Sequence, residues 1–231
     1  MRQHTTSRVV PLTGEHRLTL GRMHHPVRGI LHGSAAVLSV AGLVAMVNTG
    51  ASSHRLWALV VYGVALVALY TTSALYHAIP WRPVWKARFQ RLDHTVIYVL
   101  VAGTFTPLAV ALLDGRWVWY GLSLVWGLAA VGAAREFWVQ FRTRGSLVLQ
   151  VVLVALGLVP LFEMFSRMDP LIVMLTVGGG VIYIGGMLML VSGWPRLVPR
   201  VFSYHEFFHV LVILASVVHF LAIRQVTLAS V

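Results

Sequence analysis

The sequence contains no cysteine and few charged residues. Cysteine is absent from all 231 residues, which excludes disulfide bonds, iron–sulfur clusters and thiolate metal sites. Charged residues make up 11% of the chain, whereas a soluble domain usually carries about 25%. This composition excludes intrinsic disorder, a coiled coil and an ordinary soluble enzyme. Any metal ion in this protein must therefore be bound by His, Asp or Glu.

Acidic residues are especially scarce. The chain has 7 Asp and Glu against 18 Lys and Arg, a net charge of +11. In a soluble protein this excess would suggest nucleic-acid binding. Here 58% of the residues are hydrophobic and the mean hydropathy is +0.80, so we expect the arginines in short loops beside anionic lipid headgroups. The predicted partners are membrane lipids and not nucleic acid, while protein partners and a homo-oligomer stay open.

Long apolar runs predict an all-α bundle of seven transmembrane helices. A bilayer core of about 30 Å requires roughly 20 apolar residues of helix. Such runs lie at 27–47, 57–77, 94–113, 117–134, 147–165, 171–191 and 204–223. Residues 1–26 are polar and are predicted to form a cytoplasmic tail, so residues 27–231 make up the membrane domain.

The basic residues predict how this bundle is oriented. With seven crossings, four of the 18 Lys and Arg residues fall on one side, namely Arg55, Arg116, Arg167 and Arg224. The other 14 fall on the side of the N-terminal tail. The positive-inside rule therefore places the N-terminus in the cytoplasm and the C-terminus outside a plasma membrane.

Polar side chains at the cytoplasmic ends of three spans form the candidate site. Ser73 and His77 close the second span four residues apart, and therefore share one helix face. His205 and His209 open the last span with the same spacing, about 6 Å along the axis and about 40° around it. Asp93 lies at the start of the third span. The predicted orientation brings all of these residues to the cytoplasmic leaflet.

Three imidazoles and one carboxylate at a single depth fit a Zn²⁺ site that keeps an open position. His77, His205 and His209 are the predicted ligands. Asp93 would orient or deprotonate a metal-bound water, whose pKa zinc can lower to about 7. Such a site predicts a zinc-dependent hydrolase of a lipid amide or ester, with that water as nucleophile.

A second interpretation of the same residues is an intramembrane protease. His205 to His209 reads H-E-x-x-H, the zinc metalloprotease signature, with Glu206 as general base. However, no acidic residue follows Glu206, so a downstream acidic ligand is not available. His219 lies about 21 Å further along the same helix by rise, too far to join the site.

The remaining histidines are expected to have other roles. His32 and His94 are predicted to hydrogen-bond or to support the site without binding the ion. The histidines in polar flanks are predicted to be solvated: His4, His16, His24, His25 and His54.

Three separate blocks resemble the hemolysin III family, the bacterial branch of the progestin and adipoQ receptor superfamily. The likeness covers nearly the whole chain from about residue 25. The blocks are His32-Gly33, then Ser73-x-x-x-His77 followed by Asp93, then His205-x-x-x-His209 followed by His219-Phe220. The chain departs from the family pattern before the first block, with His24, His25 and Arg28 where many members have acidic residues and an Asn.

This resemblance implies a seven-helix fold with a cytoplasmic-side zinc ion bound by His77, His205 and His209. Asp93 would hold the metal-bound water, with Ser73 nearby as a second catalytic residue. Similarity to adiponectin receptors and alkaline ceramidases implies hydrolysis of a lipid amide. Two alternatives stay open: a non-enzymatic regulator or sensor of membrane lipids with structural zinc, and a pore-forming hemolysin-type protein.

Overall fold

Six long helices make up most of the described chain. The computed structural model describes residues 23, 25–49, 52–138, 164–198 and 201–229. Within these ranges the helices are α1 Pro26–Val47, α2 Ser53–Ala78, α3 Pro83–Leu112, α4 Arg116–Trp138, α6 Pro170–Ser192 and α7 Tyr204–Ala229. Each is long and apolar enough to cross a membrane, which confirms the all-α membrane class. The span predicted at 147–165 lies outside the described residues except at its last two positions, as does most of the predicted tail.

The start of α3 differs from the expectation. The third span was predicted from residue 94, with a loop before it, but the helix begins at Pro83. Pro83 occupies the first turn, where its missing N–H costs nothing. The Trp81 ring stacks on Phe89 at 4.2 Å and its Nε1–H donates to the Leu75 carbonyl, which ties the end of α2 to the start of α3. Hydropathy marks where a helix is apolar, whereas helical hydrogen bonding here continues into a basic segment.

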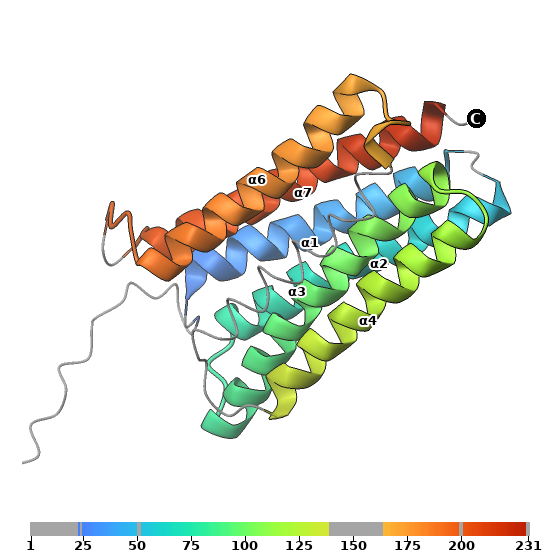
Figure 1. The fold of residues 1–231 in the computed structure, drawn as a ribbon. Helices are drawn as coiled ribbons and strands as arrows, with labels where there is room; N and C mark the ends of the chain where they lie inside the picture. The colour runs from blue at the N-terminus through green and yellow to red at the C-terminus, as the bar shows by residue number, and fades with distance from the viewer. Residues whose placement is uncertain (1–22, 24, 50–51, 139–163, 199–200, 230–231) are drawn as a thin grey trace, which may run out of the picture.

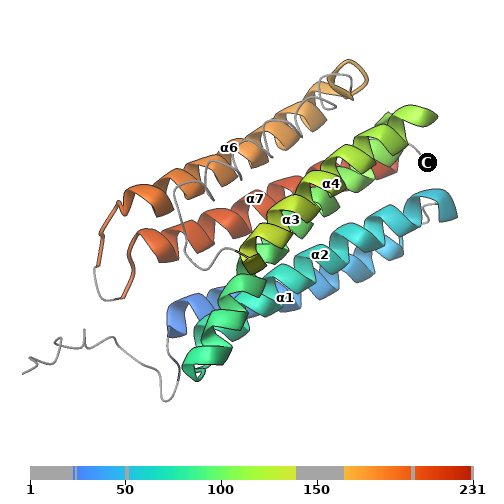
Figure 2. The same cartoon turned by 60° about the horizontal axis from the view of Figure 1, so that its bottom comes forward.

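The helices pack side by side with their axes roughly aligned (Figure 1). Neighbours in sequence are neighbours in space for α1 with α2, α2 with α3, α3 with α4 and α6 with α7. The second view shows α1 beside α2 and α6 beside α7 (Figure 2). Contacts of α7 with α1 and α3 close the bundle. As a result, α1, α3 and α7 begin, and α2 ends, at one end of the molecule.

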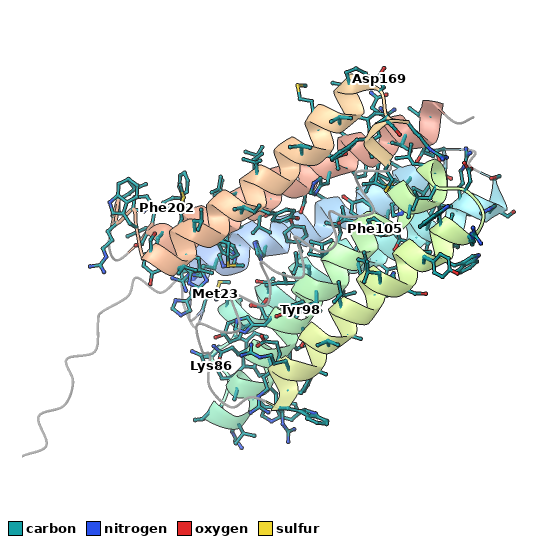
Figure 3. The ribbon with its side chains drawn as sticks, viewed as in Figure 1. Met23, Lys86, Tyr98, Phe105, Asp169 and Phe202 are labelled. Carbon is teal, nitrogen blue, oxygen red and sulfur yellow. The ribbon has the colours of Figure 1, made fainter. Side chains whose placement is uncertain are left out.

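Labelled side chains mark the two ends of the bundle. Met23, Lys86 and Phe202 lie at the end where α7 begins, whereas Asp169 lies at the opposite end (Figure 3). The first of these ends contains the histidines predicted to bind a metal. We therefore call it the histidine end.

A hydrogen-bond network lies midway along α7, between α2 and α6. The Tyr70 hydroxyl donates to Ser216 Oγ at 2.7 Å, and the Tyr183 hydroxyl lies 2.7 Å from the same atom. Nε2 of His219 lies 3.0 Å from the Thr176 carbonyl oxygen, to which its N–H donates. Polar groups at membrane depth are stabilised by partners inside the protein. These five residues are called the mid-bundle network below.

Candidate metal centre

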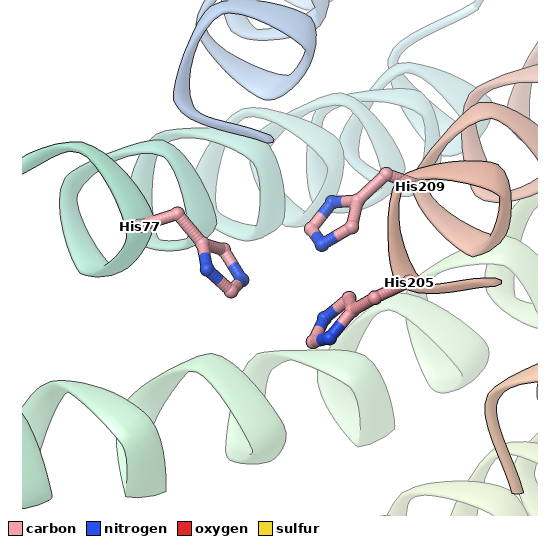
Figure 4. A group of neighbouring side chains, drawn as sticks. All are labelled: His77, His205 and His209. Atoms are coloured by element: carbon pink, nitrogen blue, oxygen red, sulfur yellow. The ribbon is translucent and has the colours of Figure 1, made fainter. Parts of the chain in front are cut away.

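Three histidines from two helices converge at the histidine end. His77 lies in the last turn of α2, while His205 and His209 lie in the first two turns of α7. One ring nitrogen of each lies within 4.8 Å of the others. The ring centroids are 4.8 Å apart for His77 and His209, and 5.4 Å for His77 and His205. Their rings face a common space (Figure 4). The three predicted ligands are therefore brought together by the fold.

These three histidines are called the histidine triad below; two of them are buried and His205 is half-buried. His77 is 3% exposed and His209 is 2% exposed. Nδ1 of His77 and Nε2 of His209 have no hydrogen-bond partner among the described residues. Leaving a buried polar atom unsatisfied costs about 1–3 kcal/mol. A divalent cation would satisfy both atoms, and imidazole nitrogens suit zinc and related metals. The residues present therefore fit a metal ion.

The two predicted catalytic residues lie on α2 and α3. Ser73 is 3% exposed and precedes His77 by one turn on the same face of α2. Asp93 is half-buried and lies about three turns into α3, which begins at Pro83. Its carboxylate is not one of the atoms within 4.8 Å of each other, so the triad itself consists of imidazoles. The roles of Asp93 and Ser73 stay predictions.

His32 on α1 contacts the triad through His209. Nδ1 of His209 lies 2.7 Å from Nε2 of His32 and 3.1 Å from its Nδ1. His32 is buried, and its ring packs edge-to-face on Tyr70 with centroids 5.0 Å apart. The expectation that His32 hydrogen-bonds near the site is confirmed.

Two further histidines pair outside the triad. Nδ1 of His94 lies 3.4 Å from Oε2 of Glu136, which joins α3 to α4. His219 bonds the Thr176 carbonyl on α6 and takes no part in the triad, as its spacing predicted.

His25 has a contact that the sequence analysis does not predict. It is partly exposed, and its backbone N–H donates to the His77 carbonyl at 2.9 Å, while the two rings lie 5.9 Å apart. The signal that could have found it is Pro26, since proline in a first helical turn makes the preceding residue the helix cap. His25 therefore connects the start of α1 to the end of α2.

Glu206 has a structural role that the sequence did not reveal. Its Oε1 accepts a hydrogen bond from Nε of Arg28 at 2.7 Å, and its Oε2 accepts from the Ser203 backbone N–H at 2.9 Å. A Ser followed three residues later by Glu is the pattern of a helix capping box. A general base needs a free oxygen directed at the reacting water. The contacts of Glu206 therefore favour fixing the start of α7 over the protease interpretation.

Comparison with known proteins agrees with this architecture. The family model described as Haemolysin-III related matches residues 21–220. The chain belongs to the haemolysin-III-related family. A relative named Hemolysin-3 from Bacillus cereus is 32% identical over 173 residues, covering 73% of this chain and 77% of its own. A Hemolysin-3 homolog from Bacillus subtilis (strain 168) is 29% identical over 198 residues, covering 84% and 90%.

The matched range contains the whole histidine triad and all six described helices up to residue 220. Membership of the haemolysin-III-related family and six apolar helices together establish a multi-pass protein of the cell membrane. The triad is consequently a feature of the membrane domain and not of a separate soluble part.

Proposed function

We propose that this haemolysin-III-related protein is a zinc-dependent membrane hydrolase of lipid amides or esters. The observation that supports this is the histidine triad: one ring nitrogen of each member lies within 4.8 Å of the others, and Nδ1 of His77 and Nε2 of His209 lack partners among the described residues. A zinc ion held by three protein ligands keeps a fourth position for water or substrate. Bound there, zinc would activate a water and polarise a carbonyl group.

The position of the triad favours a lipid substrate. His77 lies at the end of one apolar helix and His205 at the start of another. The ends of membrane-spanning helices lie near the headgroup region, where the ester and amide carbonyls of lipids are located. In this proposal Asp93 accepts a proton from the attacking water and returns it to the leaving group. Ser73, buried on the same face as His77, positions the reacting groups.

The test is turnover by the purified full-length protein. Ceramides and phospholipids would be supplied in detergent micelles with Zn²⁺, and released fatty acid would be measured. We expect Asp93→Asn to lower kcat about 10²- to 10⁴-fold, the usual contribution of a general acid–base. Its zinc content should be unchanged. Asp114→Asn, at the opposite end of the bundle and paired with Arg167, serves as the control that keeps full activity. Absence of metal-dependent release from every lipid class would contradict the proposal.

A second candidate is a regulator of membrane lipids in which zinc is structural. The favouring observation is that the triad joins α2 to α7, while His25, which precedes α1, and His32 on α1 also contact it. In that case chelation would lower the Tm sharply, while Asp93→Ala would leave the cellular phenotype intact. The relatives are named hemolysins, so channel conductance in pure lipid bilayers should be recorded with the same variants.

We further propose seven crossings, with residues 147–165 as the fifth, the N-terminus in the cytoplasm and the C-terminus outside. The basic residues support this orientation through the positive-inside rule. Because the chain lacks cysteine, single cysteines can be introduced directly. A membrane-impermeant maleimide should label Ser53→Cys in intact cells, and Gln90→Cys only after lysis. The reverse pattern would overturn the orientation.

A further inference from the structure

Helix α1 contributes no residue to the triad, yet two of its side chains contact the turns of α7 that carry the triad. Arg28 and His32 are four residues apart and lie on one face of α1. Their partners on α7, Glu206 and His209, are three residues apart and also share a face. The two pairs form a matched set of contacts between the helices.

The His32–His209 contact occupies one ring nitrogen of His209 and leaves the other for a metal ion. Nδ1 of His209 faces His32 at 2.7 Å, whereas Nε2 has no partner among the described residues. Two neutral imidazoles can share one hydrogen bond only if one of them donates. A ligand nitrogen needs its lone pair, so Nε2 of His209 binds a metal only when the proton is on Nδ1. In that tautomer His209 donates from Nδ1 and His32 accepts.

The Arg28–Glu206 contact acts on the neighbouring ligand. Glu206 follows His205 directly and accepts from the backbone of Ser203, so its carboxylate fixes the first turn of α7. Arg28 is 15% exposed at its side chain and Glu206 is 9% exposed, so this ion pair is shielded from water. Holding the Glu206 side chain from α1 limits the rotation of the turn that presents His205.

We propose that α1 is the positioning helix of the metal centre. His32 holds His209 with its proton on Nδ1 and its Nε2 directed at the ion, and Arg28 fixes the first turn of α7 through Glu206. This inference rests on the metal site of the proposed function. The tautomer of His209, however, can be measured in the metal-free protein. Partners of this kind behind a ligand histidine typically change metal affinity about 10- to 100-fold.

The first test is Zn²⁺ titration of the full-length protein in lipid nanodiscs. We expect His32→Leu to weaken zinc binding about 10- to 100-fold. His32→Gln keeps a carbonyl acceptor and should restore most of the affinity. If His32→Leu does not fold, His32→Asn replaces it. The Asn side chain is polar but too short to reach Nδ1 of His209, so the same loss of affinity is expected. His219→Leu, which removes a buried histidine of α7 outside the triad, is the matched control and should bind zinc normally.

The second test needs no metal. Nitrogen NMR of histidine-labelled, metal-free protein reports which ring nitrogen of His209 carries the proton, with the signal assigned by its loss in His209→Gln. We expect Nδ1–H in the wild type and a mixture of tautomers in His32→Leu. Zinc affinity and tautomer both unchanged in His32→Leu would overturn the inference. A wild type that binds no zinc, but shows the His32-dependent tautomer, would refute the proposed function and the metal-positioning role of α1, and would leave only the control of the His209 tautomer by His32.

Discussion

Helix α7 carries buried polar side chains in two places, and the two differ in how they are satisfied. In the mid-bundle network Ser216 bonds two tyrosines and His219 bonds a backbone carbonyl. At the histidine end, His205 and His209 meet His77, and the converging atoms are nitrogens of the same kind. Each N–H donates to one acceptor, so three ring nitrogens that converge on one point cannot all be satisfied by hydrogen bonds among themselves, whereas a cation satisfies them together.

The comparison shows that burial by itself does not identify a functional histidine. His219 is 8% exposed and His209 is 2% exposed, so both are buried. Nδ1 of His219 and Oγ1 of Thr176 also lack partners among the described residues. These two atoms do not form a set of three imidazoles within reach of one ion. Convergence of ligand atoms from separate helices is therefore the distinguishing feature.

Loss of a triad histidine should have the strongest consequence for metal binding. Replacing any of its members, as in His77→Ala, His205→Ala or His209→Ala, should weaken zinc binding by more than about 100-fold, since a lost ligand costs more than a lost supporting contact. Elemental analysis of the purified variants measures this directly. Ser216→Ala, in the mid-bundle network, should keep the zinc content of the wild type. One equivalent of zinc in the His209→Ala protein would show that the triad is not the metal site.

A substitution on α6 should lower stability without changing metal binding. A Cβ atom at Gly179 would lie 2.5 Å from the His219 ring, so Gly179→Ala should lower the free energy of unfolding by about 1–3 kcal/mol through overpacking. Gly178→Ala is the matched control, because a Cβ there meets nothing within 4 Å among the described residues. Chemical denaturation in detergent measures both. Equal stability of the two variants would contradict this close packing, and zinc affinity should not change in either.

The smallest effect concerns one hydroxyl. Tyr70→Phe removes the hydrogen bond to Ser216 while the Tyr183 hydroxyl keeps its contact. Hydrogen bonds between membrane helices contribute about 0.6 kcal/mol on average, so a loss of that size is expected in an unfolding titration. Removing Tyr183 as well should cost more than the sum of the two single changes, because Ser216 would then be left unsatisfied. Strict additivity would show that the two tyrosines act independently.

Much of the triad could be predicted from residue spacing and topology. His205 and His209 had to share a helix face because they are four residues apart, and the alternation of crossings placed His77 at the same end. The ion pair of Glu206 with Arg28 could not be foreseen, because the two residues are 178 apart in the chain, whereas the capping contact with Ser203 is local and follows a known sequence pattern. The H-E-x-x-H pattern was misleading because a short motif does not show where the side chain of its Glu is directed.

The start of α3 and the role of His25 were missed for a related physical reason. A hydropathy profile measures how readily each segment partitions into lipid. It therefore locates apolar stretches but not the helical turns that extend beyond them. His25 was grouped with solvated histidines because its neighbours are polar, yet its backbone bonds the end of α2.

The amino-acid sequence determined the membrane class, the apolar segment of each described helix and the metal-binding chemistry available without cysteine. These are properties of single helices in lipid, where about 20 apolar residues and a four-residue spacing are sufficient. The tertiary structure alone decided which buried histidines meet. That outcome depends on the rotation and register of α1, α2 and α7 against one another, and these are set by packing across the whole bundle.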